Sequence, residues 1–301
     1  MKTRKVNRLL KILLAAETLL LIGAVCAGLY FWKQEQLTLQ AMAEAATATT
    51  IPPTTEPTTV PTTAATTEAT TEPEPTLSPA QLAIETFAYE NDLSVEDYPE
   101  SIVALLERNP EAEEFVLNYP LEYGKEQEEV DLSEYADSET VPLFMQWDPR
   151  WGYMDYGDDV AGLTACGPVT LSMAAYYYTR SNEVSPDKVI QMALDNGYCA
   201  PGNGSYWSLI EYGAGSLGLD TAGLYIDKEV FFNNLEAGWL IICVVGEGDF
   251  TTSGHFLLIT GVEDGLLRIN DCNSRANSEK LWDFDDISDQ IVIAWVVRYY
   301  G

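Results

Sequence analysis

The chain has 301 residues, 47% of them hydrophobic, and a formal net charge of −31 at pH 7. This charge excludes a nucleic-acid partner, because phosphate binding requires a basic surface. The five cysteines include no Cys-x-x-Cys pair and no Asp-rich loop has calcium-ligand spacing, so neither a metal nor another cofactor is expected. Solubility explains the acidity, with a cationic substrate or a divalent ion as the alternative.

The N-terminal residues predict a membrane anchor. Basic residues crowd positions 1–11, and residues 12–32 form an apolar run broken only by Glu17 and Thr18. About 20 such residues suffice to cross a bilayer, with the basic end in the cytoplasm. We therefore expect a single-pass protein of the cell membrane, with a cytoplasmic tail at 1–11, a signal anchor at 12–32 and an extracellular C-terminal domain. A cleaved signal peptide, with a cleavage point at Ala41-Met42-Ala43, is the alternative.

Residues 33–77 are predicted to be a disordered linker. Positions 44–77 are almost entirely Thr, Pro, Ala and Glu, which bury too little apolar surface to offset the entropy of the chain. Order resumes at Ser78-Pro79, a helix start signal, and residues 78–140 are predicted to be a helical extension. Its helices are expected at 80–90, 99–108 and 110–118. We expect them to pack against the following domain, with a plain spacer as the alternative.

Residues 141–301 are predicted to form an α+β domain. Helices are expected at 164–178 and 185–196. Segments rich in Val, Ile, Leu and Trp predict strands at 239–245, 255–262, 266–270 and 291–299. Glu263-Asp264-Gly265 supplies a hairpin turn between the second and third of these strands. Helices followed by a run of mostly antiparallel strands are typical of α+β domains.

Cys166 and His255 are the candidate catalytic pair. Gly167-Pro168 and a helix-compatible run follow Cys166, so its thiol lies at a predicted helix N-terminus, where partial positive charge favours the thiolate. His255 is the only histidine and opens a predicted strand, and a thiol nucleophile needs such a base within hydrogen-bond reach. The alternatives are a buried structural cysteine and a histidine with a structural hydrogen bond.

A third group is needed to orient the imidazole. The predicted hairpin sends the chain back along the His255 strand, and Asp271 lies at the end of that return strand. Asn270 and Asn273 are neighbours that could substitute for it. These residue types also favour turns, so a simple turn is the alternative.

Three sequence strings carry a family resemblance: VPLFMQWDPRWGYMDYG at 141–157, LTACGPVTLSMAAYYYT at 163–179 and GHFLLITGVEDGLLRINDCNS at 254–274. In this order they resemble the peptidase family related to bacteriocin double-glycine leader peptidases, within the papain-like cysteine peptidase superfamily. The resemblance covers about residues 141–300 and implies a papain-like fold. The stretch at 97–120 also resembles a helical extension found before this domain in surface proteins of Gram-positive bacteria.

The resemblance implies a role for four residues. Cys166 matches the nucleophile, His255 the general base, Asp271 the orienting acid and Gln146 the oxyanion-hole glutamine, whose amide N–H would bind the developing negative charge. One position departs from the family pattern, because Cys272 stands where a proline usually follows the aspartate. It provides a second thiol near the expected site.

The Gly-rich stretch at 197–207 resembles a family segment that lies near the site, which implies that Tyr206 and Trp207 wall the cleft; simple packing is the alternative. Gly254 leaves room for a substrate beside the histidine. The predicted function is a membrane-anchored extracellular cysteine peptidase or amidase acting on peptides or cell-wall peptides. The alternatives are a non-catalytic surface module that binds peptides or cell-wall fragments, and a transpeptidase with the same triad.

Overall fold

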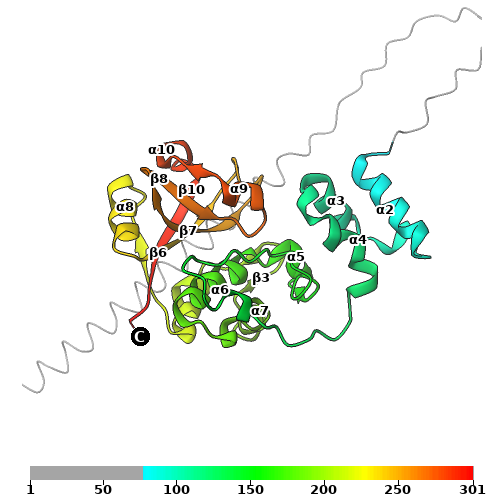
Figure 1. Cartoon of the computed structure of the whole chain (residues 1–301), viewed down its shortest axis with the longest axis horizontal. Helices are drawn as coiled ribbons and strands as arrows, with labels where there is room; N and C mark the ends of the chain where they lie inside the picture. Colours follow the sequence, from blue (N-terminus) through cyan, green and yellow to red (C-terminus); the bar gives the residue numbers. More distant parts are fainter. Residues whose placement is uncertain (1–76, 301) are drawn as a thin grey trace, which may run out of the picture. The chain divides into compact units, whose positions relative to one another are not determined.

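The computed structural model describes residues 77–300 (Figure 1). This part begins with α2 (Pro79–Glu90), α3 (Glu100–Arg108) and α4 (Glu113–Glu122). The α2 helix begins where the sequence predicts because Ser78 and Gln81 each accept a hydrogen bond from the other's backbone N–H. The three predicted helices are confirmed, although the third starts later, after a 3-10 turn at Pro110–Ala112.

These helices share a hydrophobic core with residues 143–163 of the following segment. The Phe115 ring stacks on Tyr153 with centroids 4.5 Å apart, and the Tyr153 hydroxyl donates to the Phe115 carbonyl at 2.9 Å. A Cβ on Gly162 would lie 2.5 Å from the Phe115 ring, so the ring's close approach requires glycine there. The helices therefore pack against the domain that follows them, as expected, rather than acting as a plain spacer.

The central helix of the remaining part is α6 (Cys166–Thr179). It starts two residues later than predicted, because a separate short helix, α5 (Ala161–Thr164), precedes it. Residues 167–176 of α6 are buried on every side, as expected for a helix that runs through the interior. The second predicted helix is confirmed as α7 (Pro186–Asp195), which packs against α6.

Six antiparallel strands form one sheet in the order β5–β10–β6–β7–β8–β9. Their bounds are β5 (Asp220–Leu224), β6 (Leu240–Val245), β7 (His255–Glu263), β8 (Leu266–Asn270), β9 (Leu281–Trp282) and β10 (Ile291–Arg298). The four predicted strands are confirmed at the centre of the sheet. The two edge strands were not predicted, because β5 contains Asp, Ala and Gly, which are depleted in strands, and β9 has only two residues. Two separate short hairpins pair β1 (Asp155–Tyr156) with β2 (Asp159–Val160) and β3 (Cys199–Ala200) with β4 (Gly204–Ser205).

Helices cover both faces of this sheet. The even-numbered residues of β6 join the core around α6, and the odd-numbered ones join a second core with Phe231 of α8 (Lys228–Glu236). Two short helices, α9 (Arg275–Glu279) and α10 (Phe284–Ile287), flank β9 in the sequence. The α8, α9 and α10 helices were not predicted. The arrangement confirms the predicted α+β class.

The β7–β8 hairpin controls where the candidate site forms. Its turn has positive φ angles at Asp264 (52°) and Gly265 (78°), which the predicted turn sequence tolerates. The hairpin pairs Leu258 with Asn270, so the end of β8 lies close to the beginning of β7. The predicted hairpin is therefore confirmed.

The predicted localisation requires correction. Among residues 77–300, no helix has both the length and the apolar character needed to cross a bilayer, so the prediction of a single-pass membrane protein with an extracellular domain is not supported. The predicted tail (1–11) and anchor (12–32), and all of the predicted linker (33–77) except Leu77, lie outside the described residues.

We predict that Phe115→Ala lowers the free energy of unfolding by about 3–5 kcal/mol, because it empties a buried aromatic site between the helices and the domain. Denaturant unfolding measures the change, with the exposed Leu82→Ala in α2 as a control that shifts it by less than about 0.5 kcal/mol. Unfolding of the helices in a separate transition, without loss of stability elsewhere, would contradict a shared core.

Candidate active site

Cys166 is the first residue of α6. Pro168 lies in the first turn, where its missing N–H costs no helical hydrogen bond. A Cβ on Gly167 would lie 2.8 Å from Ser205 Oγ, so glycine is required there for close packing against β4. The half-buried thiol therefore has a fixed backbone position at a helix N-terminus, as predicted.

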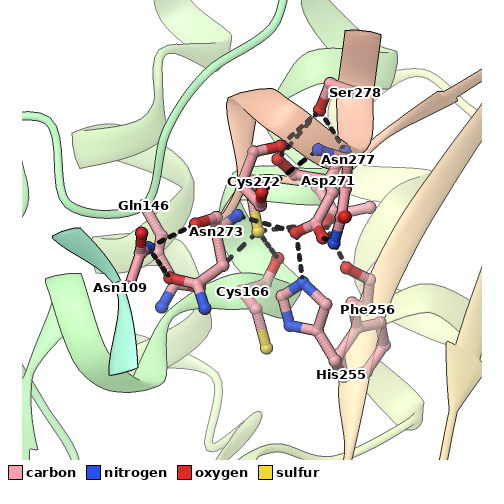
Figure 2. Close-up of polar contacts among 12 residues, drawn as sticks. Asn109, Gln146, Cys166, His255, Phe256, Asp271, Cys272, Asn273, Asn277 and Ser278 are labelled. Atoms are coloured by element: carbon pink, nitrogen blue, oxygen red, sulfur yellow. Dashed lines mark hydrogen bonds and ion pairs between the residues drawn. The ribbon is translucent and has the colours of Figure 1, made fainter. Parts of the chain in front are cut away.

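His255 opens β7 and is buried (Figure 2). Its Nε2 lies 2.8 Å from Asp271 Oδ1, and its other ring nitrogen is turned toward the side of the Cys166 thiol. The alternative partners do not contact the ring: the Asn270 amide donates to the Pro142 carbonyl at 3.0 Å. The hairpin thus brings Asp271 to the imidazole, the geometry that the sequence predicts.

The Asp271 carboxylate is only 1% exposed, and both of its oxygens accept hydrogen bonds. Besides His255, the backbone N–H of Asn273 donates to Oδ1 and the side chain of Asn277 donates to Oδ2, at 2.8 and 2.9 Å. The Asp271 backbone N–H donates to Ser278 Oγ at 2.9 Å. Burial alone would raise the pKa of Asp271, but these hydrogen bonds and the nearby imidazole outweigh it and hold that pKa below its usual value.

The thiol and the imidazole shift each other's pKa in opposite directions. Burial would raise the pKa of Cys166, but the hydrogen bond and positive charge of His255, with the backbone N–H groups of Phe256 and Gly167, lower it. Burial would lower the pKa of His255, but its hydrogen bonds with Asp271, Cys166 and Cys272 raise it well above the usual value. These opposite shifts favour the thiolate–imidazolium form of the pair over its neutral form.

Cys272 is a second thiol close to Cys166 and Gln146. Its Sγ lies 3.5 Å from Gln146 Oε1 and 3.8 Å from the Cys166 carbonyl, and it accepts from Thr170 Oγ1 at 3.8 Å. Burial raises the pKa of Cys272, whereas the imidazole and two backbone N–H groups lower the pKa of Cys166. The four cysteines among residues 77–300 are all free thiols.

Gln146 is fixed at three points. Its backbone N–H donates to the Cys272 carbonyl at 2.7 Å, its Nε2 donates to the Gly162 carbonyl at 2.9 Å, and its Oε1 faces the Cys272 thiol. The side chain is 4% exposed. This network orients the amide, with the nitrogen on the Gly162 side.

The three residues predicted to contact the substrate, Tyr206, Trp207 and Gly254, lie in three different environments. The Trp207 ring makes an edge contact with Trp295, with centroids 6.5 Å apart, and packs against the main core. Tyr206 is half-buried and its backbone N–H donates to the Tyr198 carbonyl. Gly254 is exposed, and a Cβ there would meet no atom within 4 Å. Open space therefore lies beside His255, while a cleft role for the two aromatic residues stays a prediction.

Several residues around Asp271 were not predicted. Asn277 and Ser278 reach it from α9, a five-residue helix. The available signal was Ser274, which caps α9 by accepting from the Asn277 backbone N–H. Within residues 77–300, no group of three or more His, Cys, Asp or Glu side chains is arranged to hold a metal ion.

The comparison with protein families decides the classification. The model of the Peptidase_C39 like family matches residues 138–299, which is more than half of the chain. The chain belongs to this family. It is a cysteine peptidase-like hydrolase with a papain-like α+β fold, as the sequence resemblance implies. No curated protein matches the chain.

Three solved structures are similar to this chain. The peptidase domain of Streptococcus ComA, a bi-functional ABC transporter of a quorum-sensing pathway, shares 18% identity over 53% of this chain and 99% of its own, with a TM-score of 0.39. A C39-like peptidase from Bacillus anthracis shares 14% over 58% of this chain and 100% of its own, with a TM-score of 0.37. A double glycine motif protease from an AMS/PCAT transporter, in complex with the leader peptide, shares 19% over 55% of this chain and 96% of its own, with a TM-score of 0.36.

We predict that His255→Ala raises the pKa of Cys166, because it removes the hydrogen bond and the positive charge that lower it. As the pKa of Cys166 moves toward the ordinary thiol value of about 8.5, less thiolate is present at pH 7, and the alkylation rate should fall about tenfold. The measurement is the rate of iodoacetamide labelling of Cys166 as a function of pH. Cys199→Ser, which removes another half-buried thiol, is the control that should leave the profile unchanged.

Proposed function

We propose that this hydrolase cleaves peptide bonds through Cys166 as nucleophile, His255 as general acid and base, and Asp271 as the group that orients the imidazole. Gln146 completes the site as an oxyanion donor. The observation that carries the proposal is the 2.8 Å contact from His255 Nε2 to Asp271, with the other ring nitrogen turned toward a thiol of lowered pKa (Figure 2).

In the first half-reaction, the Cys166 thiolate attacks the carbonyl carbon of the scissile peptide bond. The carbonyl oxygen becomes negative and accepts hydrogen bonds from the second Nε2 proton of Gln146 and from the Cys166 backbone N–H, one of the first N–H groups of α6, which have no partner within the helix. The imidazolium then gives the proton on its thiol-side nitrogen to the leaving amine. The C–N bond breaks, and a thioester on Cys166 and a free amine remain.

In the second half-reaction, neutral His255 takes a proton from water, and the hydroxide equivalent attacks the thioester. The carboxylic acid leaves and the thiolate–imidazolium pair is restored. Asp271 stays ionised throughout, since its lowered pKa lies far below neutrality. The reactive pair exists between the lowered pKa of Cys166 and the raised pKa of His255, so activity rises as the pH passes the first value and falls as it passes the second.

The proposed substrate is a peptide in an extended conformation. The exposed backbone at Gly254 has open space where a side chain would otherwise stand, so a substrate chain can approach the imidazole from this side. The strongly negative chain would favour a neutral or cationic peptide over an acidic one. A cell-wall peptide as the particular substrate stays a prediction.

We predict that the full chain forms a thioester with a susceptible peptide and that the adduct maps to Cys166. The test incubates the protein with a mixture of synthetic peptides. Some of them contain a Gly–Gly sequence, because one of the similar structures is a double glycine motif protease. Intact-protein and peptide mass spectrometry follow the adduct and the products. Cys166→Ala should abolish both, while Cys199→Ser should change neither.

The same experiment separates the alternatives. Addition of an amine acceptor should leave the hydrolysis product dominant, whereas a transpeptidase would transfer the acyl group to the amine. Peptide binding by both the wild type and Cys166→Ala, with no adduct and no product from the wild type, would identify a non-catalytic binding module and contradict the proposal.

We predict that Gln146→Ala lowers kcat by roughly 10²–10³-fold, because it removes one donor that is used only when the oxyanion develops. KM for the same peptide should change much less, and the pH profile of Cys166 labelling should keep its midpoint. A rise in KM with unchanged kcat would instead make Gln146 a substrate-binding residue.

A further inference from the structure

We propose that the N-terminal helices are part of the catalytic machinery, because Asn109 and Glu111 position the loop that carries the orienting carboxylate. We call residues 271–278 the Asp271 loop. The inference rests on the proposed function, since it assigns a role to residues that act through Asp271. It makes both residues positioning residues rather than groups that touch the substrate.

Glu111 binds the Asp271 loop with both carboxylate oxygens. Its Oε2 accepts from the Arg275 backbone N–H at 2.8 Å, and its Oε1 accepts from Ser274 Oγ at 3.0 Å and from the Ala276 backbone N–H at 3.3 Å. Three donors on one ionised carboxylate make a strong and directional attachment. The partners lie more than 160 residues apart in the sequence, so they link the helical segment to the C-terminal part of the chain.

Asn109 provides a second, neutral attachment. Its Nδ2 donates to the Asn273 carbonyl at 2.6 Å (Figure 2). Its Oδ1 accepts from the Glu111 backbone N–H at 3.1 Å, which orients the amide. Trp147 donates to the same Asn273 carbonyl at 3.3 Å, and the Arg275 guanidinium lies 5.3 Å from the centroid of the Trp147 ring. The outer side of the loop is thus held at Asn273 and at Arg275.

The inner side of the same loop supplies the hydrogen bonds of Asp271. The Asn273 backbone N–H donates to Oδ1, the oxygen that also contacts His255, while its carbonyl binds Asn109. One residue therefore connects the helical segment to the carboxylate. Asn277, from the helix whose first backbone N–H groups bind Glu111, donates to Oδ2.

The consequence is a coupling between the helices and the reactive thiol. Displacement of the Asp271 loop would lengthen the contact between Asp271 and His255. The imidazolium would then be less stable, and the thiolate that depends on it would be less favoured. Besides Asp271 and Cys272, the titratable side chains on or beside the loop are Arg275, Glu279 and Lys280. Glu111 itself carries a charge, so the test must separate position from charge.

We predict that Asn109→Ala and Glu111→Gln, each made in the full chain, lower kcat by roughly ten- to hundredfold with a smaller change in KM. Both should also move the midpoint of Cys166 labelling by iodoacetamide to higher pH. Asn109→Ala changes no charge, so its shift reports position alone. Glu113→Gln removes the same charge at an exposed site two residues away in α4 and should leave both readouts at the wild-type value.

Two outcomes are decisive. If the Asn109 and Glu111 variants lose thermal stability but keep the wild-type kcat and the wild-type pH midpoint of Cys166, the helices have only a structural role and the inference is overturned. Failure of the proposed function has a different signature: His255→Ala would then leave the Cys166 midpoint unchanged, which is measured in the same series.

Discussion

The hydrogen bond between His255 Nε2 and Asp271 Oδ1 joins two side chains that are 7% and 1% exposed. A buried carboxylate is costly unless its charge is paired and its oxygens accept hydrogen bonds, and this requirement explains much of the surrounding structure. The donors come from the backbone of Asn273 and the side chain of Asn277. A loop that meets all these demands has little freedom to move.

The architecture places the three proposed catalytic residues on different elements with a shared core. Cys166 begins a helix that is buried on every side, and His255 begins a strand that packs directly against that helix. Asp271 follows β8, the next strand. The hairpin turn at Asp264-Gly265 sets the pairing of β7 with β8, and this pairing determines how close Asp271 lies to His255. Because the elements are packed on both faces of the sheet, small shifts of one are resisted by the others.

Two thiols with opposite behaviour lie close together in this site. Cys166 is half-buried, and the imidazolium and two backbone N–H groups favour its charge. Cys272 is buried, and desolvation dominates there, so it acts as a weak hydrogen-bond donor toward Gln146 and the Cys166 carbonyl. The two cysteines therefore differ in pKa because they differ in exposure to solvent and in the number of hydrogen-bond donors that contact the sulfur.

The sequence by itself determined the local structure and pointed to the residues that we propose as the catalytic pair. The Ser78-Pro79 start signal, the apolar central strands and the Glu263-Asp264-Gly265 turn all act over a few residues, and each confirmed element follows from them. Cys166 and His255 are candidates from sequence alone, because a thiol at a helix N-terminus and a single histidine are local signals.

Only the tertiary structure decided how the site is supported. The edge strand β5 forms because it pairs with β10 despite weak intrinsic propensity. The choice of Asp271 over Asn270 depended on the register and end of the hairpin. The attachment of Glu111 to Arg275 and Ala276 joins backbone groups that carry no sequence signal. Contacts of this kind form between distant segments when the chain packs, and residue type alone does not specify which backbone N–H meets which carboxylate.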